Sequence, residues 1–385
     1  MKKFLPVLSF FIGLFLLCGS PACTPLKTSA ASEVSQPAAS PADTGYRIGG
    51  EWLQLQDGKF EKQAAPGAAA KIEVELSGNG PLGDIDHDGD EDVVVFLTYQ
   101  GGGSGTFTYL AAAVRKRNIF QGTNGILLGD RIGSPVAELQ NGLITVRYLD
   151  RDRNEPMAAR PSVPQTRYFI LEDSILREIV PGPDEKVLQG WLTIGHEVRS
   201  FLPCNEREDL WLHGSPNELA VIMEEYHTMM ADYPPYTPAF AILTGRRTAQ
   251  PREGFGTDYR EGLSASRLVM LWPRGNCRSD FILLDSPLPG ADLSSPFTVK
   301  GRARGNWFFE GDFPVILLDA QGNTITVSYV TAKGAWMTES FVEFEGSFAF
   351  TGPFSGRRGT LVLKKDNPTG QSRFDDFLEI PIHFK

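Results

Sequence analysis

The chain has 385 residues, with 47 acidic side chains against 37 basic ones and a formal net charge of −10. An acidic balance of this size argues against a nucleic-acid partner, which would need a basic surface. The length exceeds what one hydrophobic core usually holds, so we expect two or three domains.

The N-terminus carries the pattern of an export signal. Lys2 and Lys3 precede an apolar stretch, residues 4–17, and small residues precede Cys23. The apolar stretch is shorter than the roughly 20 residues that span a bilayer. Residues 1–22 are therefore predicted to be a cleaved signal peptide, with a retained anchor helix as the alternative.

Cleavage just before a cysteine is typical of bacterial lipoproteins, so Cys23 is the predicted lipidation site. The usual leucine three places before the cysteine is replaced by Ser20, which leaves plain secretion as the alternative. Residues 23–44 are rich in Ala, Ser, Pro and Thr and lack apolar periodicity. Such a composition predicts a flexible linker.

The first folded region is predicted at residues 45–183. Apolar and polar residues alternate at 71–76 and 143–148, which indicates half-buried strands. A glycine run at 101–105 fits neither nucleotide-binding spacing nor a nucleophile elbow, and is interpreted as a hairpin tip. We expect a β-rich α+β domain here.

Two further domains follow. In residues 187–284, Ser215 and Glu218 form a capping-box pattern at the start of one helix, and short strand patterns flank that helix. An OB-like barrel carrying one helix fits this order. Residues 286–385 contain short strands separated by glycine turns, which is typical of an antiparallel β-sandwich. The predicted fold is therefore mainly β and multi-domain.

Cysteine usage follows from export. Cys18 and Cys23 belong to the N-terminal pattern, which leaves Cys204 and Cys277 in the folded regions. An oxidising compartment makes a Cys204–Cys277 disulfide the default expectation. The alternative, a Cys204 thiol acting with a histidine, requires a free thiol that such a compartment disfavours.

The strongest candidate site is the acidic segment of residues 84–92. Carboxylates at loop positions one, three, five and nine, with Gly89 at position six, can direct oxygen ligands at one cation. Val95 stands where an EF-hand needs glutamate, but the loop is similar to the calcium loops of FG-GAP repeats. We predict a structural Ca²⁺ site with the carboxylates of Asp84, Asp86, Asp88 and Asp92 and the backbone carbonyl of Asp90, at position seven, as ligands. The alternatives are a solvated acidic turn and a catalytic metal.

The sequence contains no complete catalytic motif. His196 and Glu197 begin a segment that lacks the second histidine of a zinc-protease motif. We therefore predict no catalytic residues.

Aromatic and glycine positions mark the C-terminal region: Trp307-x-Phe309-Glu310-Gly311-x-Phe313, Asp319-x-x-Gly322 and Ile380-Pro381-Ile382. With them, residues 286–384 resemble the immunoglobulin-like domain of bacterial spore germination proteins. The resemblance implies a β-sandwich found in envelope and spore-associated proteins, with no catalytic residues to carry over.

Two looser resemblances cover the rest of the folded chain. Phe201-x-x-Cys204, Trp211 and Cys277 make residues 190–280 similar to the C-terminal OB-type domain of NlpE lipoproteins, whose matching cysteines form a disulfide. The CxxC motif of that family is missing, so copper binding and signalling are not implied. Through its aspartate loop and glycine run, the region from residue 45 to 178 resembles an uncharacterised secreted bacterial domain.

These observations predict a non-enzymatic envelope lipoprotein that presents binding domains. It would be held on the periplasmic or outer-membrane face through its lipid anchor, and would contact an envelope protein or a cell-wall component but no nucleic acid. One alternative is a redox or metal-stress sensor that uses Cys204 and Cys277. The other is a cell-wall hydrolase.

Overall fold

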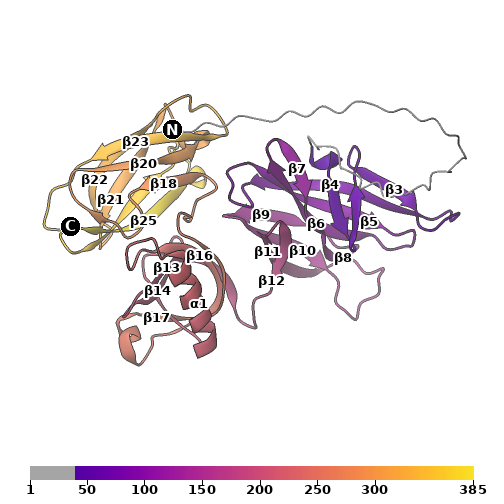
Figure 1. Ribbon diagram of the computed structural model, residues 1–385, viewed down its shortest axis with the longest axis horizontal. Helices are drawn as coiled ribbons and strands as arrows, with labels where there is room; N and C mark the ends of the chain where they lie inside the picture. Colours follow the sequence, from indigo (N-terminus) through magenta and orange to yellow (C-terminus); the bar gives the residue numbers. More distant parts are fainter. Residues whose placement is uncertain (1–39) are drawn as a thin grey trace, which may run out of the picture. The chain divides into compact units, whose positions relative to one another are not determined.

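The computed structural model describes residues 40–385, which form β-sheets with a single α-helix (Figure 1). The predicted signal peptide, Cys23 and most of the predicted linker lie outside the described residues. The last residues assigned to that linker are structured. The Ser40 side chain accepts a hydrogen bond from the Ala42 amide in the 3₁₀ turn η1 (Pro41–Asp43), and Thr44 is buried. No helix among residues 40–385 has the length and apolarity to cross a membrane.

The N-terminal region consists of three antiparallel sheets. Their strands are β1 (Gly45–Ile48) and β2 (Glu51–Gln54); β3 (Lys59–Gln63), β4 (Lys71–Gly83), β5 (Asp92–Gln100), β6 (Phe107–Lys116), β7 (Ile119–Gly122) and β8 (Ile126–Asp130); and β9 (Val136–Gln140), β10 (Leu143–Asp150), β11 (Val163–Glu172) and β12 (Ile175–Ile179). β4 and β10 confirm the two strands predicted from alternation. The glycine run joins β5 to β6, which pair as a hairpin.

One core of this region lies between the second and third sheets. It contains Val94 and Leu110 from the second sheet and Ile144 and Phe169 from the third, all fully buried. No α-helix occurs in residues 45–183. The helical component expected there is therefore not observed, because the period-two patterns of this region form strands throughout.

The middle region is a closed five-stranded barrel in the order β13-β14-β15-β17-β16. Its elements are β13 (Lys186–Ile194), β14 (Arg199–Pro203), β15 (Leu210–His213), α1 (Pro216–Met229), β16 (Ala239–Ala249), η2 (Gly254–Asp258) and β17 (Glu261–Trp272). Both hydrogen bonds of the Ser215–Glu218 capping box form at the start of α1. The helix buries Ile222 and Tyr226 within the barrel core. The expected barrel with one helix is confirmed.

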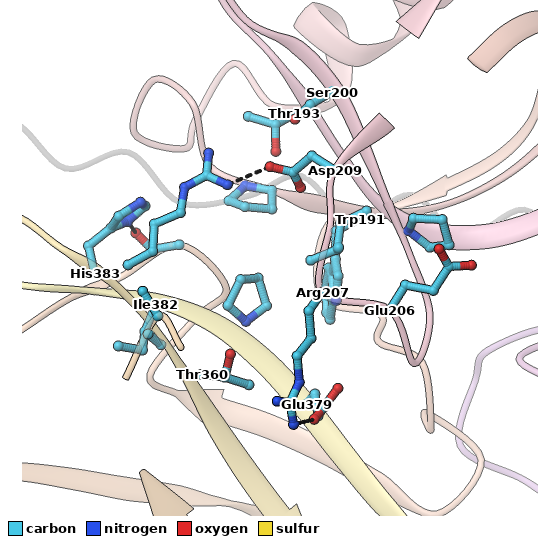
Figure 2. A pocket seen from close by; sticks show the side chains of 18 of the residues that line it. Trp191, Thr193, Ser200, Glu206, Arg207, Asp209, Thr360, Glu379, Ile382 and His383 are labelled. Atoms are coloured by element: carbon cyan, nitrogen blue, oxygen red, sulfur yellow. Dashed lines mark hydrogen bonds and ion pairs between the residues drawn. The ribbon is translucent and has the colours of Figure 1, made fainter. Parts of the chain in front are cut away.

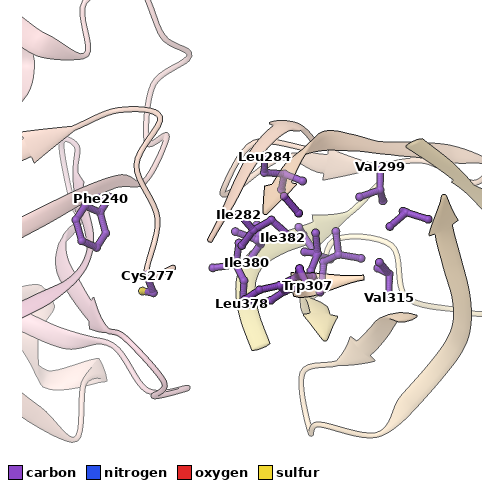
Figure 3. Packing of buried hydrophobic residues seen from close by; sticks show 14 of the residues in the cluster. Phe240, Cys277, Ile282, Leu284, Val299, Trp307, Val315, Leu378, Ile380 and Ile382 are labelled. Carbon is purple, nitrogen blue, oxygen red and sulfur yellow. The ribbon is translucent and has the colours of Figure 1, made fainter. Parts of the chain in front are cut away.

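The C-terminal region is one eight-stranded sheet, curled into a sandwich, in the order β18-β20-β23-β22-β21-β24-β25-β19. Its elements are β18 (Ile282–Ser286), β19 (Asp292–Leu293), β20 (Phe297–Arg304), η3 (Gly305–Trp307), β21 (Asp312–Asp319), β22 (Thr324–Ala332), β23 (Phe341–Phe348), β24 (Arg358–Lys364), η4 (Ser372–Phe374) and β25 (Phe377–Phe384). Trp307 is fully buried at its centre, beside aliphatic side chains of β18 and β25 (Figure 3). β18 begins at Ile282, inside the range predicted for the barrel, because it pairs with β20.

Candidate functional site

The acidic loop connects β4 to β5 and gathers three of its five aspartates. Side-chain oxygens of Asp84, Asp86 and Asp88 lie within 4.8 Å of one another. The loop's own backbone holds this shape. The Asp84 carboxylate accepts hydrogen bonds from the amides of Asp88 and Gly89, each at 3.0 Å, and Gly89 adopts a positive φ of 94°. Residues 84–88 are therefore the candidate metal centre.

The other two predicted ligands, Asp90 and Asp92, contribute no side-chain oxygen to this group. Asp92 is fully buried, and its carboxylate accepts hydrogen bonds from the amides of Ile85 and Arg115, both at 2.8 Å. This residue fastens the base of the loop to β6. The Asp90 side chain is exposed, and its amide donates to Asp88. Spacing alone could not reveal which carboxylates the backbone engages.

Lys116, at the end of β6, is a member of the site that sequence reasoning missed. Its ammonium group pairs with both Asp86 and Asp88. The Oδ1 atom of Asp86 is buried and has no hydrogen-bond partner among the described residues. Three carboxylates and one ammonium carry a net charge of −2, which a divalent cation would balance. No sequence signal links Lys116 to the loop, because β6 reaches it only through sheet pairing.

The electrostatics of the loop follow from its burial and its like charges. Desolvation by burial, reinforced by the charges of Asp86 and Asp88, raises the pKa of Asp84 to about 6. Burial likewise raises the pKa of Asp92 to about 7. A cation bound among these groups would favour their ionised forms.

His87 connects the acidic loop to the barrel. Its ring lies 4.2 Å from the ring of Trp272, measured between centroids, with an interplanar angle of 36°. Burial lowers the pKa of His87, so the imidazole is neutral at pH 7. Gly142 leaves space for the His87 ring, since a Cβ at position 142 would lie only 2.7 Å from His87 Nε2.

Cys204 and Cys277 form the predicted disulfide, with their Cα atoms 5.6 Å apart. Cys204 follows β14, and Cys277 lies in the loop between β17 and β18, residues 273–281, which we call the connecting loop. The bond therefore ties the barrel wall to the segment that leads into the C-terminal domain.

The connecting loop also contacts both neighbouring regions. The backbone N–H of Ser279 donates to the side-chain oxygen of Asn141 at 3.0 Å, and the backbone N–H of Asn141 donates to the Asp280 carboxylate at 2.6 Å. Arg278 pairs with Asp376 of the C-terminal domain at 2.6 Å. Burial raises the pKa of Asp280 to about 6. Residues from all three regions thus meet at this loop.

A cavity of about 340 Å³ is bordered by barrel residues and by residues of the C-terminal domain (Figure 2). Two ion pairs beside it join these domains. Arg358 pairs with Asp209, and Arg207 pairs with Glu379 at 3.2 Å. Sequence reasoning did not identify this cavity, because its walls come from two domains and include residues as far apart in sequence as Asp209 and Arg358.

Comparison with known proteins identifies the C-terminal domain. Residues 281–372 match the family model described as the immunoglobulin-like domain of bacterial spore germination. Neither the curated proteins nor the solved structures gave a match to the chain. The resemblance noted for residues 286–384 is confirmed, and the C-terminal β-sandwich is an immunoglobulin-like domain of this type.

Proposed function

We propose that the chain is an exported envelope lipoprotein, anchored through Cys23, whose β-domains bind an envelope protein or a cell-wall component without catalysing a reaction. The Cys204–Cys277 disulfide carries this proposal, because such bonds persist in oxidising compartments outside the cytoplasm. The immunoglobulin-like domain adds support as a binding module without a catalytic residue set. The resemblances of the barrel to NlpE lipoproteins and of the N-terminal region to a secreted domain agree with export.

The redox state of the cysteines in the cell tests the compartment. Thiols are blocked with an alkylating reagent during lysis, and the protein is then mapped by non-reducing peptide mass spectrometry. We expect the peptides containing Cys204 and Cys277 to be recovered as one disulfide-linked species from the envelope fraction. Recovery of both cysteines alkylated would contradict export.

We further propose that the candidate metal centre holds a structural Ca²⁺ through Asp84, Asp86 and Asp88. Calcium takes six to eight oxygen ligands, so backbone carbonyls and water would complete the site. The unpartnered Oδ1 of Asp86 and the net negative charge of the group support this assignment. The role is structural, since the loop fastens β4, β5 and β6 together.

Thermal unfolding in excess Ca²⁺ and in EDTA tests the calcium site. We expect Ca²⁺ to raise the Tm of the wild type, since a ligand that binds only the folded state stabilises it. Asp86→Asn should abolish the rise. Asp90→Asn is the matched control, because it removes an equal charge from the same loop outside the group. Equal Tm values for the wild type in both conditions would refute calcium binding.

A redox or metal-stress sensor is the second candidate function, favoured by the place of the disulfide. Reduction would free the connecting loop from the barrel while leaving its contacts with Asn141 and Asp376. A sensor requires a labile disulfide, whose reduction potential lies above the roughly −300 mV that bounds structural disulfides. Titration against thiol buffers measures this potential. A value below about −300 mV would identify a structural bond instead.

A further inference from the structure

The cavity between the barrel and the C-terminal domain has the size of a small-molecule site. Its volume of about 340 Å³ falls within the roughly 300–1,000 Å³ that such sites occupy. One wall carries Thr193 and Ser200 from the barrel, and the other carries Thr360 and Ile382 from the C-terminal domain (Figure 2). None of its lining residues belongs to the candidate metal centre.

The charged groups of this cavity are largely neutralised within the protein. Asp209 and Glu379 expose only 13% and 16% of their side chains, and each is paired with an arginine across the domain boundary. An anionic ligand would have to draw one of these arginines away and leave a mostly buried carboxylate without its partner. That loss is strongly unfavourable.

The two remaining carboxylates are also engaged. Glu206 pairs with Arg247, and the Asp319 carboxylate accepts hydrogen bonds from the backbone and the side chain of Asn323, at 2.8 and 3.0 Å. Asp319 keeps its negative charge, because Asn323 supplies only neutral donors, but both of its oxygens are engaged. The other three carboxylates are held in ion pairs. An uncharged ligand can therefore enter the cavity without breaking any of these interactions.

Polar groups suited to hydroxyl ligands border the same space. The hydroxyls of Thr193, Ser200 and Thr360 can each donate and accept hydrogen bonds. His383 Nδ1 lies 3.2 Å from the carbonyl oxygen of Gly290. Because a carbonyl only accepts, Nδ1 donates this hydrogen bond, which leaves Nε2 available to a ligand.

Tyr236 supplies an accessible aromatic ring at the cavity. It lies between α1 and β16 with a φ of 63°, uncommon for an aromatic residue, and is 48% exposed. A Cβ at Gly195 would lie 1.9 Å from the Tyr236 ring, so the ring packs directly on that glycine. A ring fixed in this way beside hydroxyl groups suits the apolar C–H face of a sugar.

We propose that this cavity binds a neutral carbohydrate. Tyr236 packs against one face of a sugar ring, while Thr193, Thr360 and His383 hydrogen-bond its hydroxyl groups. The two arginine–carboxylate pairs offer both donors and acceptors to the ligand without a net charge. This inference gives a chemical class to the cell-wall partner of the proposed function. It does not depend on the lipid anchor or on calcium.

Calorimetric titration of the full mature chain, residues 23–385, tests the ligand class. The neutral probes are chitotetraose, cellotetraose and maltotetraose, and the charged comparators are tetraglutamate and spermidine. We expect at least one neutral oligosaccharide to bind with a Kd below about 1 mM, and more tightly than either comparator. Absence of neutral binding, or tighter binding of a charged comparator, would overturn the proposal. Because the assay uses no membrane, its failure is separate from a failure of the anchor.

Substitutions locate the binding in the cavity. Tyr236→Ala should weaken binding by about tenfold, and Thr360→Val should weaken it by about fivefold through one lost hydrogen bond. Thr326→Val on β22, outside the cavity, should leave the affinity unchanged. If Tyr236→Ala fails to fold, Thr193→Val replaces it, since valine suits a strand. Unchanged affinity in the cavity variants would refute the site.

Discussion

Replacing Lys116 by methionine separates two explanations of the acidic loop: neutralisation by the lysine and neutralisation by a metal. The Lys116 side chain is 40% exposed, so each of its two ion pairs contributes about 1 kcal/mol or less. Leaving the mostly buried Asp86 carboxylate unpaired adds about 1–3 kcal/mol. In EDTA we therefore expect Lys116→Met to lower the free energy of unfolding by about 1–5 kcal/mol.

Calcium should reverse this loss. Free Ca²⁺ at 100 times its Kd stabilises a folded state by about 2.7 kcal/mol. The variant should also bind Ca²⁺ more tightly than the wild type, because no ammonium group competes for Asp86 and Asp88. Urea denaturation in EDTA and in Ca²⁺ measures both effects, and Lys62→Met, which breaks an exposed pair with Glu51, is the control. A deficit of equal size in both conditions would show that Lys116, and not calcium, neutralises the loop.

Three further predictions concern the junction of the domains. The pKa of Asp280 is raised to about 6 from an ordinary 3.8, so its contribution to stability is greatest below pH 4 and is lost as the pH rises through 6. That loss amounts to about 3 kcal/mol. In urea denaturation from pH 4 to pH 8, the free energy of unfolding of Asp280→Asn should therefore depend less on pH than that of the wild type. An equal pH dependence of the two proteins would refute this prediction. Gly142→Ala should destabilise by more than about 1 kcal/mol and alter Trp272 fluorescence through His87. Gly67→Ala is its control, because Gly67 also has a positive φ, of 75°, but no atom lies close to the position of its added Cβ. Equal losses of stability in the two variants would show that contact with His87 does not contribute to the effect of Gly142→Ala. Replacing both Cys204 and Cys277 by serine opens a loop of 73 residues and should lower the free energy of unfolding by about 4 kcal/mol in urea denaturation; a loss below about 1 kcal/mol would contradict a stabilising disulfide.

Local sequence signals predicted the local structure well. The capping box at Ser215 and Glu218 positioned α1, because both of its hydrogen bonds are made within one turn. Strict alternation at residues 71–76 indicated β4, because period two fits only an extended chain. The Cys204–Cys277 disulfide was predicted because export places the chain in an oxidising compartment and only these two cysteines lie in the folded regions. The capping box and the alternation involve residues close together in the sequence, and the two cysteines of the folded regions have only each other as a partner.

Contacts between distant segments could not be predicted in this way. Lys116 reaches the acidic loop only because β6 pairs with β5, and no spacing rule encodes that approach. The carboxylate of Asp92 resembled a metal ligand in the sequence, yet it binds the amide of Arg115. The ion pair between Asp209 and Arg358 depends on how two domains meet. Tertiary packing decides all three.

The measurement that tests the central claim most directly is lipid labelling at Cys23. Cells expressing the full chain are grown with radiolabelled palmitate, and the wild type is compared with Cys23→Ser and with the control Cys18→Ser. We predict label in the envelope-associated wild-type protein and in Cys18→Ser, and none in Cys23→Ser, because Cys23 is the proposed site of lipid attachment. Label that survives Cys23→Ser, or a wild-type protein without label, would contradict the lipoprotein assignment.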